Sequence, residues 1–143
     1  MKLKLGNYDI EIIHHDPTIF TVEQVLTDSE CEHFQKIASK NMKRSMVSGF
    51  DKEQNKRGLL DNRRTSSNCW ISHSLDQITQ DVGNRISELV QVPITHAESY
   101  QVLHYTDSQE YQPHLDTFDP DKKEYSHYLT NGGQRIITAL AYL

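Results

Sequence analysis

Two places in this 143-residue chain carry a histidine and an aspartate two positions apart: His14 with Asp16, and His114 with Asp116. In a β-strand, side chains at such positions point to the same side, roughly 6.5–7 Å apart, so an imidazole and a carboxylate can bind one metal ion. Two histidines and one carboxylate on one octahedral face leave open positions, the arrangement of non-haem Fe(II) oxygenases. Each pair could therefore supply two of three iron ligands.

The spacing alone is a weak signal, because a chain with 8 histidines is expected to contain about one such pair by chance. Pro17 directly follows the first pair and favours a turn, so we interpret His14, His15 and Asp16 as a capping or surface cluster. The second pair lies in a segment predicted to be a strand. The sequence lacks the zinc-protease, phosphate-loop, dinucleotide-binding and nucleophile-elbow motifs.

The composition indicates one small globular domain, because 143 residues with 36% hydrophobic and 24% charged content suffice for one core. The net charge of −5 argues against a nucleic-acid partner. No apolar run approaches a membrane span or the core of a signal peptide, so the sequence predicts a cytoplasmic protein without a membrane partner. Cys31 and Cys69 lie far apart, which favours a reducing compartment and no zinc site.

Two amphipathic helices are predicted to support a sheet. Thr27 and Glu30 have the spacing of a capping box, and the apolar residues that follow share one helical face. These residues are Cys31, Phe34, Ile37 and Ala38. A second stripe runs to about Val90 and comprises Leu75, Ile78, Val82, Ile86 and Leu89. Both stripes are expected to pack against strands, whereas Cys69 and Trp70 are interpreted as packing residues.

Strands are predicted over six ranges: 2–13, 19–26, 65–71, 98–105, 111–116 and 136–143. Between the second and third of these, residues 42–64 are polar and rich in turn-forming residues, which is typical of a mobile functional loop. A disordered insertion is the alternative. The order of elements predicts an α+β fold with the helices on one face of a largely antiparallel sheet.

The residues around the second pair resemble a known family. Tyr100-Gln101-Val102-Leu103-His104-Tyr105, a polar turn, and Tyr111-Gln112-Pro113-His114-Leu115-Asp116 together resemble the iron-binding core of prolyl 4-hydroxylases, which are Fe(II)/2-oxoglutarate-dependent dioxygenases. Three further segments resemble that family in the same order: residues 25–31, Arg64-Thr65-Ser66-Ser67, and Gly132-Gly133-Gln134-Arg135 leading into 136–143. The resemblance extends from about Pro17 to Leu143.

This resemblance implies a double-stranded β-helix, or jelly-roll, core with two supporting helices. It implies Fe(II), 2-oxoglutarate and ascorbate as cofactors, and a proline-containing peptide or protein as the substrate. His114 and Asp116 would be iron ligands and catalytic residues. Tyr105 matches a position against 2-oxoglutarate, and Tyr142 one near its distal carboxylate, with core packing as the alternative for both.

The resemblance also implies a peptide groove. Tyr111 and Arg135 match positions that line it, and residues 46–63 match the mobile loop that closes over bound peptide. Arg64 is assigned to substrate binding on the same basis, with bracing of the sheet as the alternative. Proline-rich peptides are already extended and dock well on aromatic surfaces, which suits such a groove.

Two features of the family are missing: a distal histidine as third ligand, and a basic residue for the far carboxylate of 2-oxoglutarate. The residues after Asp116 are too few for the second half of a core of about eight strands. We therefore expect a domain over residues 1–143 that is incomplete at its C-terminal side and inactive alone. Residues 136–143 would then form an exposed apolar strand able to self-associate.

The sequence leaves three alternatives to an incomplete hydroxylase domain. A second polypeptide or a swapped copy could complete the barrel. The chain could be a finished peptide-binding or interaction module without turnover. A nucleic-acid-directed dioxygenase is disfavoured by the acidic charge.

Overall fold

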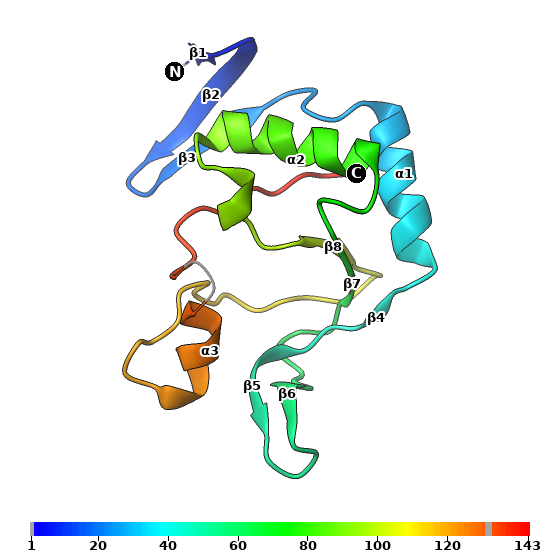
Figure 1. The fold of residues 1–143 in the computed structure, drawn as a ribbon, viewed down its shortest axis with the longest axis vertical. Coiled ribbons are helices and arrows are strands. Elements are labelled where there is room, and N and C mark those ends of the chain that lie inside the picture. The colour runs from blue at the N-terminus through cyan, green and yellow to red at the C-terminus, as the bar shows by residue number, and fades with distance from the viewer. Residues whose placement is uncertain (1, 131–132) are drawn as a thin grey trace.

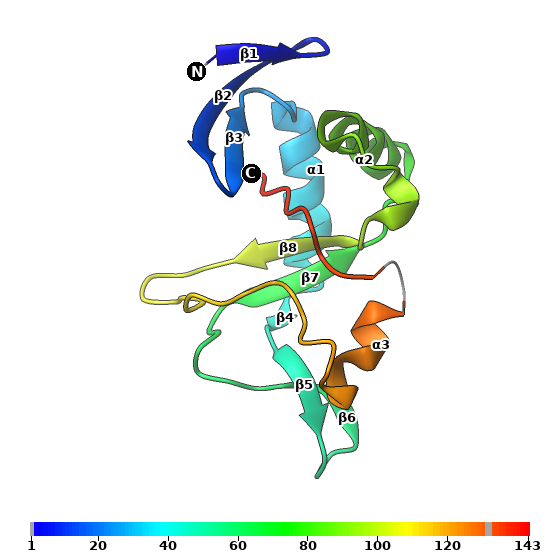
Figure 2. The same cartoon turned by 90° about the vertical axis from the view of Figure 1, so that its left-hand side faces the viewer.

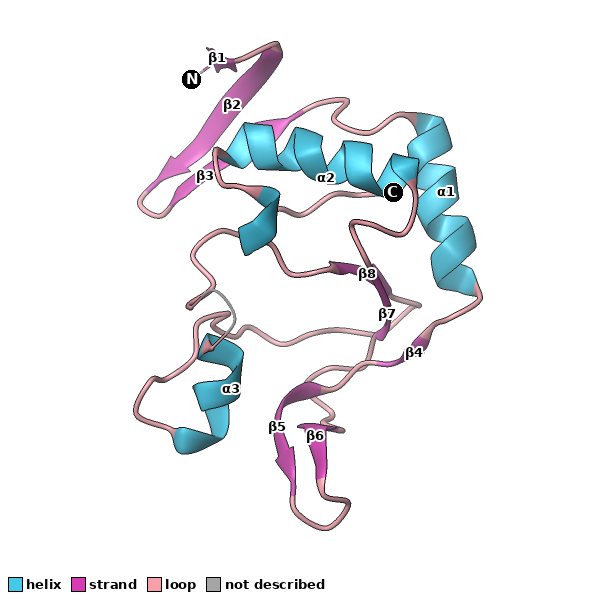
Figure 3. Cartoon of the chain, in the orientation of Figure 1, coloured by secondary structure: helices cyan, strands magenta, loops and turns pink. Residues whose placement is uncertain are grey.

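The structure, a computed structural model, describes residues 2–130 and 133–143, apart from the side chain of residue 124. It is a mixed α/β fold with antiparallel sheets (Figures 1 and 3). In chain order the elements are β1 (Lys2–Leu5), β2 (Tyr8–His15), β3 (Thr18–Val22), α1 (Asp28–Ser39), β4 (Lys43–Arg44), β5 (Val47–Asp51), β6 (Lys56–Leu59), β7 (Ser67–Ile71), α2 (Gln77–Val90), the 3-10 turn η1 (Ile94–His96), β8 (Tyr100–His104), the 3-10 turn η2 (Lys123–Tyr125) and α3 (Ser126–Leu129).

Both predicted helices are present, and local side chains define their starts. At α1 the Thr27 hydroxyl accepts from the Glu30 backbone N–H at 3.3 Å, and the Glu30 carboxylate accepts from the Thr27 N–H at 2.8 Å. This confirms the capping box. At α2 the Asp76 carboxylate accepts from the Thr79 N–H at 2.9 Å, and the helix ends where Gln91 adopts a left-handed conformation.

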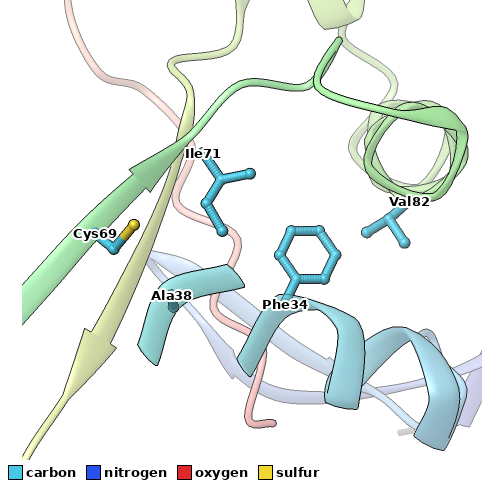
Figure 4. Close-up of a cluster of buried hydrophobic side chains, with 5 residues drawn as sticks. All are labelled: Phe34, Ala38, Cys69, Ile71 and Val82. Atoms are coloured by element: carbon cyan, nitrogen blue, oxygen red, sulfur yellow. The ribbon is translucent and has the colours of Figure 1, made fainter. Parts of the chain in front are cut away.

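The main core lies where α1 and α2 cover one face of the sheet β4-β7-β8. Along β7, Cys69 and Ile71 are buried and Trp70 between them is 52% exposed, as expected when successive strand residues point to opposite faces. Figure 4 shows Phe34 of α1 between Ile71 of β7 and Val82 of α2. Cys69 is a packing residue as predicted, whereas the packing role predicted for Trp70 is wrong because its side chain points away from the helices.

Hydrogen bonds between polar and charged side chains connect α1 to α2. Arg85 of α2 donates to both carboxylate oxygens of Glu30 at 2.8 and 2.9 Å, and also to the Val25 carbonyl. The Arg85 guanidinium lowers the pKa of Glu30 to about 2. His33 Nε2 lies 2.7 Å from Asp76 Oδ2, which connects α1 to the first turn of α2. The arrangement of α1 and α2 therefore depends on one ion pair and one histidine–carboxylate hydrogen bond as well as on apolar packing.

Two further sheets lie at opposite ends of the molecule (Figure 2). The first is β1-β2-β3, in which the strand predicted over 2–13 is two antiparallel strands with Gly6 in the turn at φ 59°. The second is the hairpin β5–β6. It falls within residues 42–64, which were predicted as a long functional loop or a disordered insertion, so part of this segment is a paired hairpin. Its mobility stays a prediction.

Two of the predicted C-terminal strands are absent from the structure. Residues 111–116 form no strand; one isolated bridge joins Tyr111 to Arg64. Residues 136–143 have no strand pairing with other described residues. Their apolar side chains are largely exposed: Ile136 is 81%, Leu140 68% and Tyr142 90% exposed. The prediction of an exposed apolar segment is confirmed, and the prediction that it is a strand is wrong.

None of the helices among the described residues has the length and apolar character that a membrane-spanning helix needs.

Candidate active site

The second histidine–aspartate pair converges in the structure. His114 Nε2 lies 3.3 Å from Asp116 Oδ1, and the two side chains are 38% and 44% exposed. His114 Nδ1 lies 2.8 Å from the Gln112 carbonyl oxygen. A carbonyl can only accept, so Nδ1 carries the hydrogen and Nε2 is directed at Asp116. The other Asp116 oxygen accepts from the Thr138 hydroxyl at 3.1 Å.

This geometry suits a shared cation. When Nε2 carries no hydrogen, its lone pair faces a carboxylate oxygen, which is unfavourable unless a proton or a cation lies between them. Neighbouring ligands of a metal ion with bonds of ~2.0–2.2 Å are about 3 Å apart, close to the observed separation. Donation of the second ring N–H to a backbone carbonyl is also usual for metal-binding histidines. The pair therefore fits two positions of a metal site.

A third protein ligand is not found in the described part of the chain. No group of three or more His, Cys, Asp or Glu side chains that could hold a metal ion occurs among residues 2–130 and 133–143. The pair alone would bind Fe(II) weakly, because most metal sites in proteins rely on three or more protein ligands.

His114 and Asp116 converge for a reason other than the one predicted. They lie in an irregular segment, in which Leu115 between them is 85% exposed and points away. The Nδ1 hydrogen bond fixes the imidazole and the Thr138 hydroxyl fixes the carboxylate. The juxtaposition is thus set by side-chain hydrogen bonds instead of strand alternation.

Tyr111 stacks on His114, with ring centroids 3.6 Å apart and planes at 20°. On the Tyr111 ring, at 4.6 Å from its centroid, lies the guanidinium of Arg64, which is 8% exposed. Cation–π contact of this kind stabilises a buried guanidinium. The structure thus places Arg64 and Tyr111 directly behind the histidine.

A pocket of about 200 Å³ lies in front of this pair. Its walls combine Val47 and Ser48 of β5 with aromatic and basic side chains from the C-terminal half. The pocket is also lined by Tyr111, His114, Asp116, Phe118, Tyr125 and Arg135. The pocket is therefore bounded on one side by the hairpin and on the other by aromatic rings.

Arg135 is held in place at this pocket by two neighbours. It forms an ion pair with Glu98, with one N–O distance of 2.8 Å, and its guanidinium lies 5.0 Å from the Phe118 ring centroid. The hydrogen bonds that Arg135 donates to the Glu98 carboxylate raise the pKa of Arg135. Gln134 accepts from the Phe118 N–H at 2.9 Å and donates to the Phe118 carbonyl at 2.5 Å, so its amide fixes the backbone beneath that ring.

Two of the predicted cofactor residues are not at the pocket. Tyr105 follows β8 and is 43% exposed, and Tyr142 is 90% exposed; neither is among the described residues that line the pocket. Gly132 of the Gly-Gly-Gln-Arg motif lies outside the described residues.

Three residues at the site were not predicted from the sequence: Thr138, Phe118 and Gln134. Nothing in their local pattern distinguishes them, because each acts through a contact with a residue distant in sequence.

The known proteins that are similar to this chain include several prolyl 4-hydroxylases. The chain is 38% identical to Probable prolyl 4-hydroxylase 8 of Arabidopsis thaliana over 96% of its length, covering 46% of that protein. It is 36% identical to Prolyl 4-hydroxylase 5 over 96% of its length, covering 45%. It is 34% identical to Prolyl 4-hydroxylase 1 of the same plant over 99% of its length, covering 48%.

The chain thus spans about half the length of the curated relatives it matches. No protein-family model matches it. Over nearly its whole length the chain is nevertheless prolyl 4-hydroxylase-like in sequence, which confirms the resemblance that its motifs indicated.

Proposed function

We propose that this protein acts as a prolyl 4-hydroxylase, an Fe(II)/2-oxoglutarate-dependent dioxygenase that hydroxylates proline in a peptide or protein. The arrangement of His114 and Asp116 carries the proposal, because the histidine tautomer and the orientation of the carboxylate both suit a shared metal ion. The names of the relatives support the same reaction. We further propose that residues 1–143 belong to one domain of double-stranded β-helix type.

In this proposal His114 and Asp116 hold Fe(II). When bound, iron with 2-oxoglutarate and O2 would supply the oxidation of a proline C–H bond, with ascorbate as the reductant of the iron. Of the two neutral imidazole tautomers, the Gln112 carbonyl favours the one with hydrogen on Nδ1, in which Nε2 can bind a metal ion. The Thr138 hydroxyl occupies Asp116 Oδ2, which leaves Oδ1 for the ion.

The walls of the pocket would bind the substrate. A proline-rich segment is extended and apolar, and docks readily on an aromatic face such as that of Tyr125, while the rings of Tyr111 and Phe118, whose faces contact other side chains, border the same pocket. Arg135, fixed by Glu98, borders the same space and could donate to a peptide carbonyl. The hairpin wall at Val47 and Ser48 would limit the entry of water, which reactive oxygen chemistry requires.

The roles proposed for Tyr105 and Tyr142 beside 2-oxoglutarate are supported by the resemblance alone. Self-association through residues 136–143 also stays a prediction, supported by the exposed apolar side chains of that segment.

The test is turnover by the protein as its gene encodes it. We expect succinate release from 2-oxoglutarate with Fe(II), ascorbate and a proline-rich peptide, accompanied by a 16 Da increase, the mass of about one oxygen atom, in the peptide. The His114→Ala variant should lose both products. If the protein as its gene encodes it releases no succinate and leaves the peptide unchanged, the proposed reaction is wrong.

A non-catalytic peptide-binding module is the second candidate. It is favoured by the finding that the described residues contain no set of three metal ligands. Titration calorimetry with the same peptide separates the two functions: binding that is independent of Fe(II) and 2-oxoglutarate, together with absent turnover, would establish the module.

A further inference from the structure

We propose that Tyr111 and Arg64 are positioning residues that hold the His114 imidazole in its ligand orientation through a three-layer stack of guanidinium, phenol ring and imidazole. The expected effect on metal binding rests on the proposed function. The geometry of the stack can be tested without it. It gives both residues a role apart from direct contact with substrate.

The first layer of contact fixes the plane of the imidazole. The hydrogen bond from Nδ1 to the Gln112 carbonyl places one ring atom but leaves the ring able to turn about that bond. The Tyr111 ring covers one face of the imidazole at 3.6 Å and nearly parallel, which restricts this rotation. With both constraints present, Nε2 is directed towards Asp116.

The second layer fixes Tyr111. Arg64 lies behind the phenol ring and is almost completely buried. Among the described residues, its guanidinium donates from Nη1 to the Met46 carbonyl at 3.0 Å, while its Nε is buried without a hydrogen-bond partner. A buried cation with so few polar partners is costly, and the electron-rich ring face partly offsets that cost. The guanidinium and the ring therefore hold each other in place.

The backbone explains why these two side chains are adjacent. Thr65 N–H donates to the Glu110 carbonyl and Gln112 N–H donates to the Arg63 carbonyl, each at 2.8 Å. These bonds flank the bridge between Arg64 and Tyr111, which makes them a non-hydrogen-bonded antiparallel pair. Side chains are closest in pairs of that kind. The stack thus follows from the local pairing.

The stack also connects the histidine to the base of the β5–β6 hairpin. Met46, whose carbonyl receives the Arg64 hydrogen bond, directly precedes β5, and Val47 of β5 lines the pocket. The Arg44 side chain donates to the Arg64 and Ser66 carbonyls, which braces the same backbone. A change in the hairpin would therefore reach the imidazole through Arg64 and Tyr111.

Proton NMR of the metal-free 143-residue chain tests the stack directly. Ring protons of His114, assigned with the His114→Gln variant, should be shifted upfield by the Tyr111 ring. Tyr111→Phe keeps an aromatic face and should retain this shift, whereas Tyr111→Leu should move the signals downfield. In Co²⁺ titrations, Tyr111→Leu should weaken binding about tenfold and Tyr111→Phe less than about twofold, as for other supporting residues of metal ligands.

Arg64 is tested with Arg64→Met and Arg64→Lys, with Arg57→Met on exposed β6 as the matched control. Arg64→Met should move the His114 signals in the direction seen for Tyr111→Leu, Arg64→Lys should move them less, and the control should leave them unchanged. If Arg64→Met does not fold, as judged by its amide spectrum, Arg64→Lys and Tyr111→Leu still carry the test.

Unchanged His114 signals in Tyr111→Leu, or in the folded Arg64 variants, would overturn the inference. Because the signals are recorded without metal, they are independent of catalysis. Loss of the proposed function would appear instead as absent metal binding and turnover in the unaltered protein, with the ring shifts still present.

Discussion

The Thr138 hydroxyl donates to Oδ2 of Asp116 at 3.1 Å, while Oδ1 of the same carboxylate faces His114 Nε2. The C-terminal segment therefore contributes to the histidine–aspartate pair although it forms no strand with the described residues. One carboxylate oxygen is occupied by the protein and the other is left directed at the shared space.

Removal of the Thr138 hydroxyl should weaken metal binding without changing the ligands. In Thr138→Val the side chain keeps its shape but cannot donate, so Asp116 gains rotational freedom and we expect Co²⁺ or Fe²⁺ affinity to fall about tenfold. Thr138→Ser retains the hydroxyl and should bind within about threefold of the unaltered protein. Titration by absorption spectroscopy measures both, and equal affinities for the two variants would exclude this role of the hydroxyl.

The two histidine–aspartate pairs provide a matched comparison. His114→Ala or Asp116→Ala should abolish specific metal binding at the pocket, because each removes one of the two ligands that converge there. His14→Ala should leave binding unchanged, since the His14 ring lies 2.8 Å from the Pro17 carbonyl in the exposed turn after β2. Metal affinity lost with His14 and retained without His114 would transfer the site to the first pair.

The helices could be predicted because their signals are local. A capping box joins residues three positions apart, as at Thr27 and Glu30, and an apolar stripe repeats within one element. The α2 stripe began at Leu75, but the helix begins after Asp76, whose carboxylate caps Thr79. Tertiary contacts such as that of Arg85 with Glu30 follow no short-range pattern and could not be predicted.

The convergence of His114 and Asp116 could be predicted from the sequence, but the local structure that produces it could not. The alternation around Tyr111–Asp116 resembled a strand, yet strand formation also needs a partner, and within residues 111–116 only Tyr111 forms a bridge. Pro113 lacks an N–H and further weakens pairing there. Thr138 and Gln134 contact residues about twenty positions away, which spacing within a motif cannot reveal.

Acid should destabilise the protein through Glu30. Its pKa is lowered from 4.5 to about 2, mainly by hydrogen bonds from Arg85, so the folded state resists protonation more than the unfolded chain does. The stabilisation is therefore complete above about pH 4.5 and disappears as the pH falls towards 2. Urea unfolding should show Glu30→Gln less stable by about 1–3 kcal/mol at pH 7, with little difference near pH 2.

Glu32→Gln on the exposed side of α1 is the control for this pH dependence and should follow the unaltered protein at every pH. A destabilisation by Glu30→Gln of the same size at pH 7 and pH 2 would show that the Arg85 ion pair is not its cause.

Gly83 should resist replacement by alanine, although alanine is favoured over glycine in a helix by about 1 kcal/mol. A Cβ at this position would lie 2.8 Å from the Tyr100 hydroxyl oxygen and 3.1 Å from Ile94 Cδ1. The Tyr100 hydroxyl cannot easily move, because it donates to the Thr79 carbonyl at 2.8 Å and the ring packs edge-on against Phe34. We therefore expect Gly83→Ala to destabilise the protein by about 1–3 kcal/mol.

A double-mutant cycle with Tyr100→Phe tests the cause of that destabilisation. Deleting the phenol oxygen removes the close contact, so Gly83→Ala should cost much less in the Tyr100→Phe background than in the unaltered protein, as measured by thermal and urea unfolding. The remaining contact with Ile94 leaves a smaller penalty in the double variant. Additive effects of the two substitutions would mean that α2 and β8 are not packed as closely as the Gly83–Tyr100 contact requires.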